Sequence, residues 1–444
     1  MTRAHRFFIA ALGCPKNLVE SELISGAFLA AGDTICFSPD DADIYLINTC
    51  AFLPSARSEA AAEIADAVEW KRRAPGRRIA VAGCLMNHPQ FPGFREHFPE
   101  VDLWCRVNDT ARLRELLLAG EEPSAEKKCT YLCNDAMPRI QLTLPHIAYL
   151  KISDGCDNRC AYCAIPALRG ALRSRPMPSI LAEAAVLIGN GVRELVVIAQ
   201  DTTAYGHDLK DGSSLAGLLE NLAALPGNFV IRVLYTHPAH YTDRLIGVLA
   251  DHAPRILPYL DMPIQHISDR LLAAMNRHID RRGILALTEK LRGSIPGLTL
   301  RTTFITGLPG ESEEEFADLC GFVRSCAFER MGVFSYAPEP GTKAAGMPDQ
   351  ISAEVADARA AELMRIQRRI MLRTQRAAIG STVRVLVDRI EDGFAYARGA
   401  ADAPEIDNSV IFPACRSVRA GEFVDVKIIK AAGSDLVGEK SRKR

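Results

Sequence analysis

The chain has 444 residues, which at roughly 150 residues per domain is enough for about three domains. Apolar residues make up 48% and charged residues 24%, and this composition excludes a disordered or collagen-like chain. Lysine and arginine total 53 against 54 for aspartate and glutamate, so no overall charge draws the chain toward nucleic acid or membrane. Any polyanion would have to be held by a local patch.

No apolar run reaches the roughly 18 residues that a membrane-spanning helix needs. The N-terminus imitates a secretory signal, but its apolar core, Phe7–Leu12, is shorter than the roughly 7–15 residues that a signal requires. We therefore expect a first buried strand there and a cytoplasmic protein. Thirteen cysteines in such a chain point to metal or redox chemistry, because disulfides are rare in a reducing compartment.

In residues 1–120, short apolar strands alternate with helical patterns. The expected strands are Arg6–Leu12, Ile35–Phe37, Asp43–Asn48, Arg78–Gly83 and Val101–Trp104, with helices at Asn17–Ala31 and Ser55–Lys71. This alternation implies parallel βαβ units and a doubly wound α/β sheet. Residues 121–145 are polar and rich in proline, and we expect them to form a linker.

The alternation resumes over residues 146–351. The expected strands are His146–Ile152, Arg193–Ala199, Phe229–Tyr235, Ile256–Asp261, Thr299–Ile305 and Gly332–Tyr336, each followed by a helical segment. Six βα units fit either a doubly wound sheet or an incomplete (β/α) barrel, and periodicity does not separate the two.

A long connecting helix is predicted over residues 352–378. Five of its arginines, spaced by three and four residues, make one basic face: Arg365, Arg368, Arg369, Arg373 and Arg376. Such a face is either a solvated surface or a contact for RNA or phosphate. In residues 379–444 the period changes to two, and five short strands predict a small antiparallel β-barrel followed by a basic tail, Lys440, Arg442, Lys443 and Arg444.

Three cysteines with the spacing C-x-x-x-C-x-x-C follow the first strand of the middle block: Cys156, Cys160 and Cys163. Soft thiolates on one loop select an iron–sulfur cluster or zinc. A structural zinc site wants four closed ligands, and no nearby Cys or His completes the set. Three ligands leave one iron open, at the strand end where barrels of this class place their active sites.

A second set of cysteines is dispersed. Cys14, Cys50 and Cys84 each follow a strand of the first block, and the carboxyl ends of parallel strands share one edge of the sheet. In the common strand order 2-1-3-4-5 the first, third and fourth strands are neighbours, so the three thiols should converge. Three unrelated buried cysteines are the alternative. We expect the remaining cysteines to be core residues, with Cys129 and Cys133 in the linker as a weaker metal-binding alternative.

The motif CDNRCAYC, with Tyr162 before its third cysteine, is similar to that of the radical S-adenosylmethionine (SAM) family. Together with GCPKNLVESE, NTC and AGC it makes the chain resemble the methylthiotransferases almost from end to end. The resemblance implies a flavodoxin-like N-terminal domain, an incomplete (β/α)6 radical-SAM barrel and a C-terminal TRAM barrel. It also implies two 4Fe-4S clusters, on the two sets of three cysteines. One SAM molecule would supply the methyl group, and a second would supply a 5′-deoxyadenosyl radical that abstracts hydrogen.

Tyr162 and several residues outside the cysteine loop are expected to contact SAM. The segment that ends the fifth barrel strand is similar to the glycine motif of the radical-SAM family, which implies cofactor contacts at Thr303, Gly307, Gly310 and Glu311. The pairs Gln200-Asp201 and Gln265-His266 also follow strands, and either pair would contact the cofactor or substrate, or only form hydrogen bonds within its loop. Hydrogen abstraction by a carbon radical needs little acid–base machinery, so we expect His237 to be structural.

Within this family the substrate is either a protein or a transfer RNA. The segments IAQDTTAYG and YLDMPIQHISDRLLAAMNR resemble the branch that modifies the β-carbon of an aspartate in small-subunit ribosomal protein twelve, although Glu20 stands where that branch often carries Asp. The predicted C-terminal barrel has seven basic and ten acidic residues between positions 378 and 439, which favours a basic protein partner over RNA.

The alternatives are a transfer-RNA adenosine methylthiotransferase and a non-enzymatic iron–sulfur redox protein. We further expect a flavodoxin or ferredoxin as the reductant. The substrate protein would be met either free or within the ribosomal particle, and nothing in the sequence demands more than a monomer.

Overall fold

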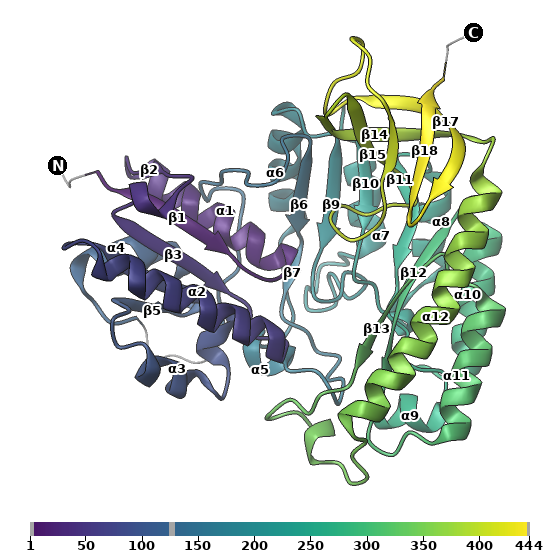
Figure 1. Ribbon diagram of the computed structural model, residues 1–444, viewed down its shortest axis with the longest axis horizontal. Coiled ribbons are helices and arrows are strands. Elements are labelled where there is room, and N and C mark those ends of the chain that lie inside the picture. Colours follow the sequence, from purple (N-terminus) through teal and green to yellow (C-terminus); the bar gives the residue numbers. More distant parts are fainter. Residues whose placement is uncertain (1–3, 124–128, 442–444) are drawn as a thin grey trace.

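The computed structural model describes residues 4–123 and 129–441. It confirms the expected fold class, with a doubly wound α/β domain, a six-stranded parallel sheet and a closed five-stranded barrel. In Figure 1 the N-terminal domain (purple) lies beside the large sheet, and the small barrel (yellow) covers one end of that sheet. Residues 442–444 of the predicted basic tail lie outside the described residues.

The N-terminal domain is built on five parallel strands in the order β2-β1-β3-β4-β5, the order on which the convergence of the three dispersed cysteines depends. The strands are β1 Arg6–Ala11, β2 Thr34–Ile35, β3 Ile44–Thr49, β4 Arg78–Gly83 and β5 Leu103–Cys105. The helices are α1 Pro15–Ala30, α2 Pro54–Arg72, α3 Phe91–His97 and α4 Leu113–Ala119. Two separate apolar clusters cover the two faces of the sheet, α1 and α4 packing on one side and α2 and α3 on the other.

The middle sheet resolves the choice between a doubly wound sheet and a barrel. Its strands are β6 Ile147–Lys151, β9 Glu194–Ile198, β10 Val230–Val233, β11 Ile256–Asp261, β12 Thr299–Thr306 and β13 Arg330–Ser335. They pair in sequential order, all parallel, whereas a doubly wound sheet reverses its strand order at a switch point. The described residues contain no pairing of β6 with β13, so the barrel is incomplete.

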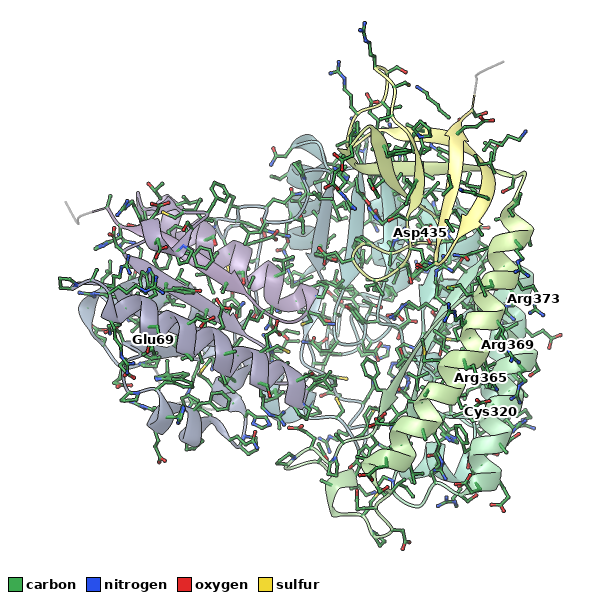
Figure 2. All side chains as sticks on the ribbon, in the orientation of Figure 1. Glu69, Cys320, Arg365, Arg369, Arg373 and Asp435 are labelled. Atoms are coloured by element: carbon green, nitrogen blue, oxygen red, sulfur yellow. The ribbon has the colours of Figure 1, made fainter. Side chains whose placement is uncertain are left out.

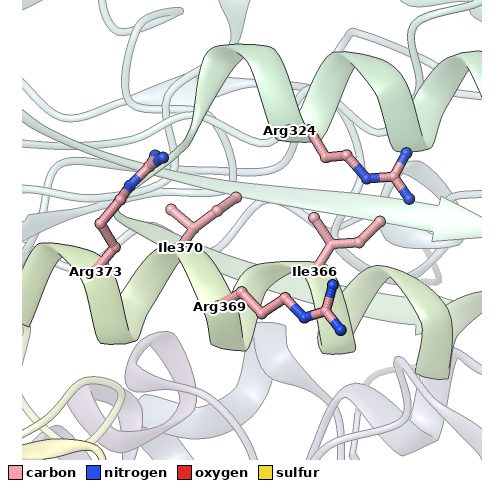
Figure 3. Close-up of a pocket in the computed structure, with 5 residues that line it drawn as sticks. All are labelled: Arg324, Ile366, Arg369, Ile370 and Arg373. Atoms are coloured by element: carbon pink, nitrogen blue, oxygen red, sulfur yellow. The ribbon is translucent and has the colours of Figure 1, made fainter.

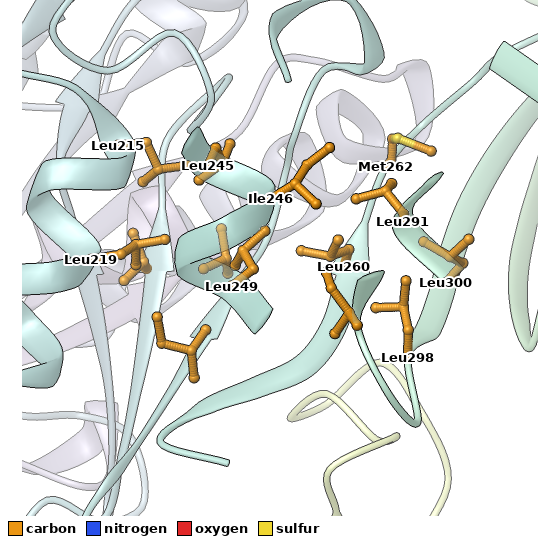
Figure 4. Packing of buried hydrophobic residues seen from close by; sticks show 14 of the residues in the cluster. Leu215, Leu219, Leu245, Ile246, Leu249, Leu260, Met262, Leu291, Leu298 and Leu300 are labelled. Atoms are coloured by element: carbon orange, nitrogen blue, oxygen red, sulfur yellow. The ribbon is translucent and has the colours of Figure 1, made fainter. Parts of the chain in front are cut away.

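Helices follow the strands of this barrel and cover its outer face. They are α5 Ile165–Arg169, α6 Met177–Gly189, α7 Leu215–Ala223, α8 Asp243–Asp251, α9 Asp269–Ala274, α10 Arg281–Ser294 and α11 Glu313–Cys326, and a small antiparallel pair joins β7 Ser153–Asp154 to β8 Arg173–Ser174. Figure 4 shows the core between strands and helices, where Leu219, Leu249 and Leu260 pack among other buried aliphatic side chains. This burial is the main stabilising contribution to the barrel.

The C-terminal part begins with the long helix α12, Ala353–Ala378, which packs along α11 and β13. The barrel strands are β14 Thr382–Glu391, β15 Phe394–Gly399, β16 Val410–Pro413, β17 Phe423–Ala432 and β18 Asp435–Lys440. One detail of the prediction was wrong: the barrel is not wholly antiparallel, because β16 and β18 pair in parallel to close it.

Two further expectations need correction. The predicted strand Ile35–Phe37 ends at Ile35, and the Phe37 side chain is 96% exposed. Cys415 was expected in the core, but it lies exposed between β16 and β17, because the chain has already left the barrel wall there. None of the helices in the described residues is long and apolar enough to span a membrane.

The small barrel docks on the amino ends of the large sheet's strands through buried ion pairs. Arg398 binds Glu194 at 2.7 Å, and Asp402 binds Arg330 at 2.6 Å. Asp388 pairs with Arg398 inside the same contact, and Asp407 accepts a hydrogen bond from Tyr259. Three of the barrel's ten acidic residues therefore face inward, and its net charge does not describe the surface that a partner would meet. The charge argument for a basic protein partner loses its physical basis.

The segment after the N-terminal domain contains no helix or strand in its described residues, but it packs closely against α1. Arg139 forms ion pairs with Glu22 of α1 and with Glu183 of α6. A Cβ atom built on Gly26 would lie 2.3 Å from the backbone oxygen of Pro138. The approach of these two backbones thus requires glycine at position 26.

We predict that Gly26→Ala destabilises the protein, although alanine normally favours a helix interior by about 1 kcal/mol over glycine. The Pro138 backbone cannot yield as a flexible side chain would, so α1 has to shift away from the linker. Thermal unfolding should show a lower melting temperature. Gly321→Ala in α11 is the matched control, since a Cβ there meets nothing within 4 Å, and it should raise the melting temperature. A rise for both variants would contradict the prediction.

Candidate functional site

The dispersed cysteines of the N-terminal domain lie at the carboxyl ends of three adjacent strands. Cys14 precedes α1, Cys50 follows β3, and Cys84 follows β4. The side-chain oxygen of Asn17 lies 3.8 Å from the sulfur of Cys84 and 4.0 Å from that of Cys14. The structure therefore brings these thiols to one edge of the sheet, around the first turn of α1.

Glycines make this close approach possible. Gly13 has φ +90°, and a Cβ atom on it would lie 2.3 Å from the Cβ of Cys50. Gly83 has φ +105°, and its Cβ would lie 2.3 Å from the carbonyl oxygen of Thr49. Each glycine directly precedes a cysteine, so the chain can turn sharply at the strand end and direct the next residue to the shared edge.

The clustered cysteines lie on the loop that follows β6 and β7. Its backbone is held from two sides, because the amide of Ala161 donates to Met275 and the amide of Ala344 donates to Ala161. The guanidinium of Arg277 lies 3.4 Å from the sulfur of Cys160 and 3.4 Å from the hydroxyl of Tyr162. Tyr162 thus packs at the thiols together with a buried cation that the sequence analysis had not singled out.

Neither thiol group has the close spacing that a single zinc ion requires. Tetrahedral zinc with bonds of about 2.3 Å holds its sulfurs roughly 3.8 Å apart. Among the described residues, no three cysteines have sulfurs within 4.8 Å of one another. Burial raises the pKa of Cys84 and Cys163 to about 12 and that of Cys156 to about 11. These thiols are therefore protonated near neutral pH until a metal displaces the proton.

A buried ion network joins the two thiol groups across the domain boundary. Glu20 of α1 accepts a hydrogen bond from Lys151 of β6 at 2.8 Å and forms an ion pair with Arg169 of α5. Lys151 also binds Asp154, which lies two residues before Cys156. The Nε of Arg169 lies 3.1 Å from the sulfur of Cys84. One set of buried charges therefore connects Cys84 with the segment that leads into Cys156.

Sequence reasoning had noted Glu20 only as a minor departure from a family pattern. A lysine inside the apolar strand Ile147–Lys151 was the available signal, because a charge buried in a strand demands a partner. Burial alone would raise the pKa of Glu20, but the charges of Arg169 and Lys151 outweigh it and lower the pKa below its usual value. Glu20 is therefore held ionised.

The residues expected to contact SAM differ in whether their side-chain oxygens already have hydrogen-bond partners. Glu311 is occupied: it accepts from the amide of Gly307 at 2.5 Å and from Arg359 at 2.7 Å. Gln200 donates to Asp154 at 2.7 Å, while its buried side-chain oxygen has no partner among the described residues. The buried oxygen of Gln265 is likewise unpaired. These two oxygens suit the hydroxyl or ammonium donors of a ligand such as SAM, whereas Glu311 shapes the turn.

The remaining residues of the glycine motif are placed by backbone geometry. Gly307 and Gly310 have φ of +74° and +75°. A Cβ on Gly307 would lie 2.2 Å from the Cβ of Ala356 in α12, so this turn packs against the long helix. The backbone oxygen of Thr303 accepts from the amide of Gln265. The motif therefore fixes the position of Gln265 at the carboxyl end of the barrel.

Asp201, His237 and His240 form a further polar cluster near these residues, with potential ligand atoms within 4.8 Å of one another. Hydrogen bonding already occupies much of it, since Asp201 bonds His240 at 2.9 Å and the Nδ1 of His237 accepts from the amide of Ala239. Burial lowers the pKa of His237 to about 2, so the ring is neutral and its proton is on Nε2. That buried Nε2 has no partner among the described residues, so His237 keeps a free donor beside its structural bond.

Comparison with known proteins agrees with this architecture. Family models match residues 6–106 (the uncharacterized protein family UPF0004), residues 150–323 (the radical SAM superfamily) and residues 379–440 (the TRAM domain). A ribosomal protein uS12 methylthiotransferase RimO from Desulforamulus reducens is 40% identical over 97% of this chain and 98% of its own length. The chain belongs to the RimO family.

Other members of the family and more distant structures extend the comparison. The RimO of Syntrophus aciditrophicus is 41% identical over 97% of both chains. Among solved structures, the radical SAM methyltransferase TsrM from Kitasatospora setae has a TM-score of 0.58 at 14% identity and covers 94% of this chain and 81% of its own. The cobalamin-dependent radical enzyme OxsB has a TM-score of 0.53 at 11% identity, covering 83% of this chain and 56% of its own. These structures show a shared fold.

We predict that Glu20→Gln lowers the free energy of unfolding of the apoprotein by about 3 kcal/mol, because it leaves Lys151 and Arg169 buried with less compensating charge. Denaturant unfolding followed by circular dichroism measures this loss. Glu69→Gln is the matched control, since Glu69 pairs with Arg72 on the exposed face of α2 (Figure 2) and should leave unfolding unchanged. Equal effects of the two substitutions would contradict a special role for the network.

The parent protein and the Glu20→Gln variant should also differ in how their stability depends on pH. The pKa of Glu20 is lowered in the folded state, so its contribution to stability is present above the unfolded value of about 4.5 and is lost as the pH falls further. The parent apoprotein should lose stability between about pH 5 and pH 3, and Glu20→Gln should lose less over this interval. If the free energy of unfolding fell by the same amount in both proteins over this pH interval, the prediction would be contradicted.

Proposed function

We propose that this chain is a radical-SAM methylthiotransferase that adds a methylthio group to the β-carbon of an aspartate in small-subunit ribosomal protein twelve, uS12. Membership of the RimO family supports the reaction and the substrate. The observation on this chain that carries the proposal is the juxtaposition of two thiol groups, one from each domain, around a single buried ion network. An enzyme that joins sulfur to an unactivated carbon needs a sulfur source and a radical source close together.

The radical-SAM match implies one 4Fe-4S cluster and SAM, and we assign that cluster to Cys156, Cys160 and Cys163. A second 4Fe-4S cluster on Cys14, Cys50 and Cys84 is the finer part of the proposal. When bound, SAM supplies a methyl group from one molecule and a hydrogen-abstracting 5′-deoxyadenosyl radical from another.

Residues of the protein would bind and orient the clusters and SAM. Arg277 places a cation at Cys160 and Tyr162, and Arg169 places one at Cys84, so each candidate cluster has a fixed positive neighbour. A donor next to a cluster sulfur raises its reduction potential. The free oxygens of Gln200 and Gln265 would accept from the cofactor, with Thr303, Gly307, Gly310 and Glu311 holding the turn beside them.

We place the enzyme in the cytoplasm, as a monomer that takes electrons from a flavodoxin or ferredoxin.

Its chain divides into a cluster-binding domain over residues 1–120, a linker over 121–145, the radical-SAM barrel over 146–351, the connecting helix over 352–378 and the TRAM barrel over 379–444. The small barrel contacts the amino ends of the large sheet's strands, while the thiols follow the carboxyl ends. The TRAM barrel is therefore kept away from the radical chemistry.

Substitution of the cysteines tests the two-cluster assignment. Cys84→Ala and Cys160→Ala should each reduce the iron bound after anaerobic reconstitution to about half of the parent value, and the double variant should bind almost none. Iron and sulfide analysis with electron paramagnetic resonance gives the measurement. Cys320→Ala, which removes a buried thiol from α11, is the control and should leave the iron content unchanged. Full iron content in Cys84→Ala would overturn the second cluster.

Mass spectrometry of the products tests the activity. Reduced, reconstituted enzyme with SAM and sulfide is offered uS12 and bulk transfer RNA together, and we expect a methylthio group on an aspartate of uS12 and none on RNA. Methylthio-adenosine in the RNA would make the transfer-RNA reaction the function. Reversible redox cycling without any SAM cleavage would leave only an iron–sulfur redox protein.

A further inference from the structure

Helix α12 has a row of exposed arginines with almost no counter-charge. Residues 363–380 contain five arginines and no acidic residue. All five side chains are exposed, namely Arg365, Arg368, Arg369, Arg373 and Arg376. Figure 2 shows Arg365, Arg369 and Arg373 following one another along the outer side of the molecule. With a rise of about 1.5 Å per residue the row is roughly 16 Å long.

Part of this row lines a groove between α12 and α11. Arg369 and Arg373 of α12 lie along it with Arg324 of α11, and Ile366 and Ile370 form its floor. The groove has a volume of about 330 Å³. Figure 3 shows the three guanidinium groups at its rim, on both sides of the two isoleucines. The site therefore has a fixed apolar base and three cationic groups that can turn toward one ligand.

Ion pairing within the molecule does not explain the row. Glu362 lies 2.6 Å from Arg365 and 3.6 Å from Arg324. In the part of the chain that the structure describes, no ion pair is formed by Arg368, Arg369, Arg373 or Arg376. The helix dipole favours cations only near the last turn, which accounts for Arg376 and not for the arginines one to three turns earlier. Like charges spaced by four residues cost the helix about 0.2–0.5 kcal/mol per pair, so the row does not serve the stability of α12.

We propose that the phosphodiester backbone of RNA binds in this groove, and that the RNA belongs to the ribosomal particle that carries the substrate protein. This inference rests on the proposed function. All five cations of the row are arginines, whose planar guanidinium groups match phosphate oxygens in a two-point contact. A row of this length faces several successive phosphates. The enzyme would then act on uS12 within a particle, and α12 would hold that particle against the outer side of the barrel.

RNA binding by the reconstituted enzyme tests the groove directly. Fluorescence anisotropy with a labelled fragment of small-subunit ribosomal RNA, measured across a salt series, should give a steep dependence of binding on salt. The charge-reversal pair Arg369→Glu with Arg373→Glu should weaken binding and flatten the slope of log K against log salt by about one per arginine lost. Displacement of the RNA by polyglutamate at an equal charge concentration would indicate an acidic protein and overturn the proposal.

A matched control removes the effect of net charge. Arg416 and Arg419 of the small barrel are also exposed and form no ion pair among the described residues, so reversing both changes the charge by the same amount. That pair should leave RNA binding and its salt slope unchanged. An equal loss in both pairs would show a non-specific effect of charge and overturn the groove. The circular dichroism spectrum of each variant identifies any that has failed to fold.

Rates of uS12 methylthiolation distinguish a failure of RNA docking from a failure of the proposed function. The parent enzyme should modify uS12 in small-subunit particles faster than free uS12, and the α12 variant should lose that advantage while modifying free uS12 at the parent rate. Modification of free uS12 alone, or equal rates on particles for parent and variant, would overturn RNA docking and leave the proposed function standing. Absence of methylthiolated uS12 in every arm would instead count against the proposed function, while the binding measurement would still decide whether the groove takes RNA.

Discussion

The ion network around Glu20, Lys151, Asp154 and Arg169 constrains the rest of the structure. Each of these charges is almost completely buried, and a buried charge without a partner costs several kcal/mol. Glu20 comes from the N-terminal domain, while its cationic partners come from the barrel. Separation of the domains would take Glu20 away from Lys151 and Arg169 and leave Asp154 as the carboxylate that pairs with both cations. The pairing therefore favours one relative placement of the domains, in which one set of charges reaches both Cys84 and Asp154, two residues before Cys156.

Within this frame, parallel strand ends position the chemistry. Cys14, Cys50 and Cys84 each follow a strand of the N-terminal sheet closely, and the ends of these adjacent parallel strands lie side by side. Cys156, Cys160 and Cys163 share one loop after β7. Glycine at positions 13 and 83 permits the close contacts that a Cβ atom would prevent. The apolar strands and helices supply the rigidity, and the polar atoms left free at their ends, such as the oxygens of Gln200 and Gln265, supply the capacity to bind. Stability and binding are thus divided between neighbouring segments of the same chain.

Charge is distributed unevenly over the surface of a nearly neutral protein. The small barrel directs part of its acidity inward against Arg330 and Arg398, whereas α12 keeps its arginines exposed. The charges counted along the sequence predicted an acidic surface for the barrel. They left two interpretations of the basic helix face, a solvated surface or a contact for RNA or phosphate. Only the folded arrangement shows which charges are already neutralised, because pairing depends on the distance between atoms far apart in the chain.

Several features were determined by the sequence itself. The alternation of apolar strands and helices established the α/β class, the spacing of Cys156, Cys160 and Cys163 indicated a cluster loop, and the change of period after Gly380 predicted a small barrel. These are local patterns, set by the geometry of strands and helices. The tertiary structure decided what depends on distant pairing: the sequential order of the six strands, the parallel contact of β16 with β18, and the link from Glu20 through Arg169 to Cys84. A sequence pattern reports which residues face a core, but not which residue of another domain lies opposite them there.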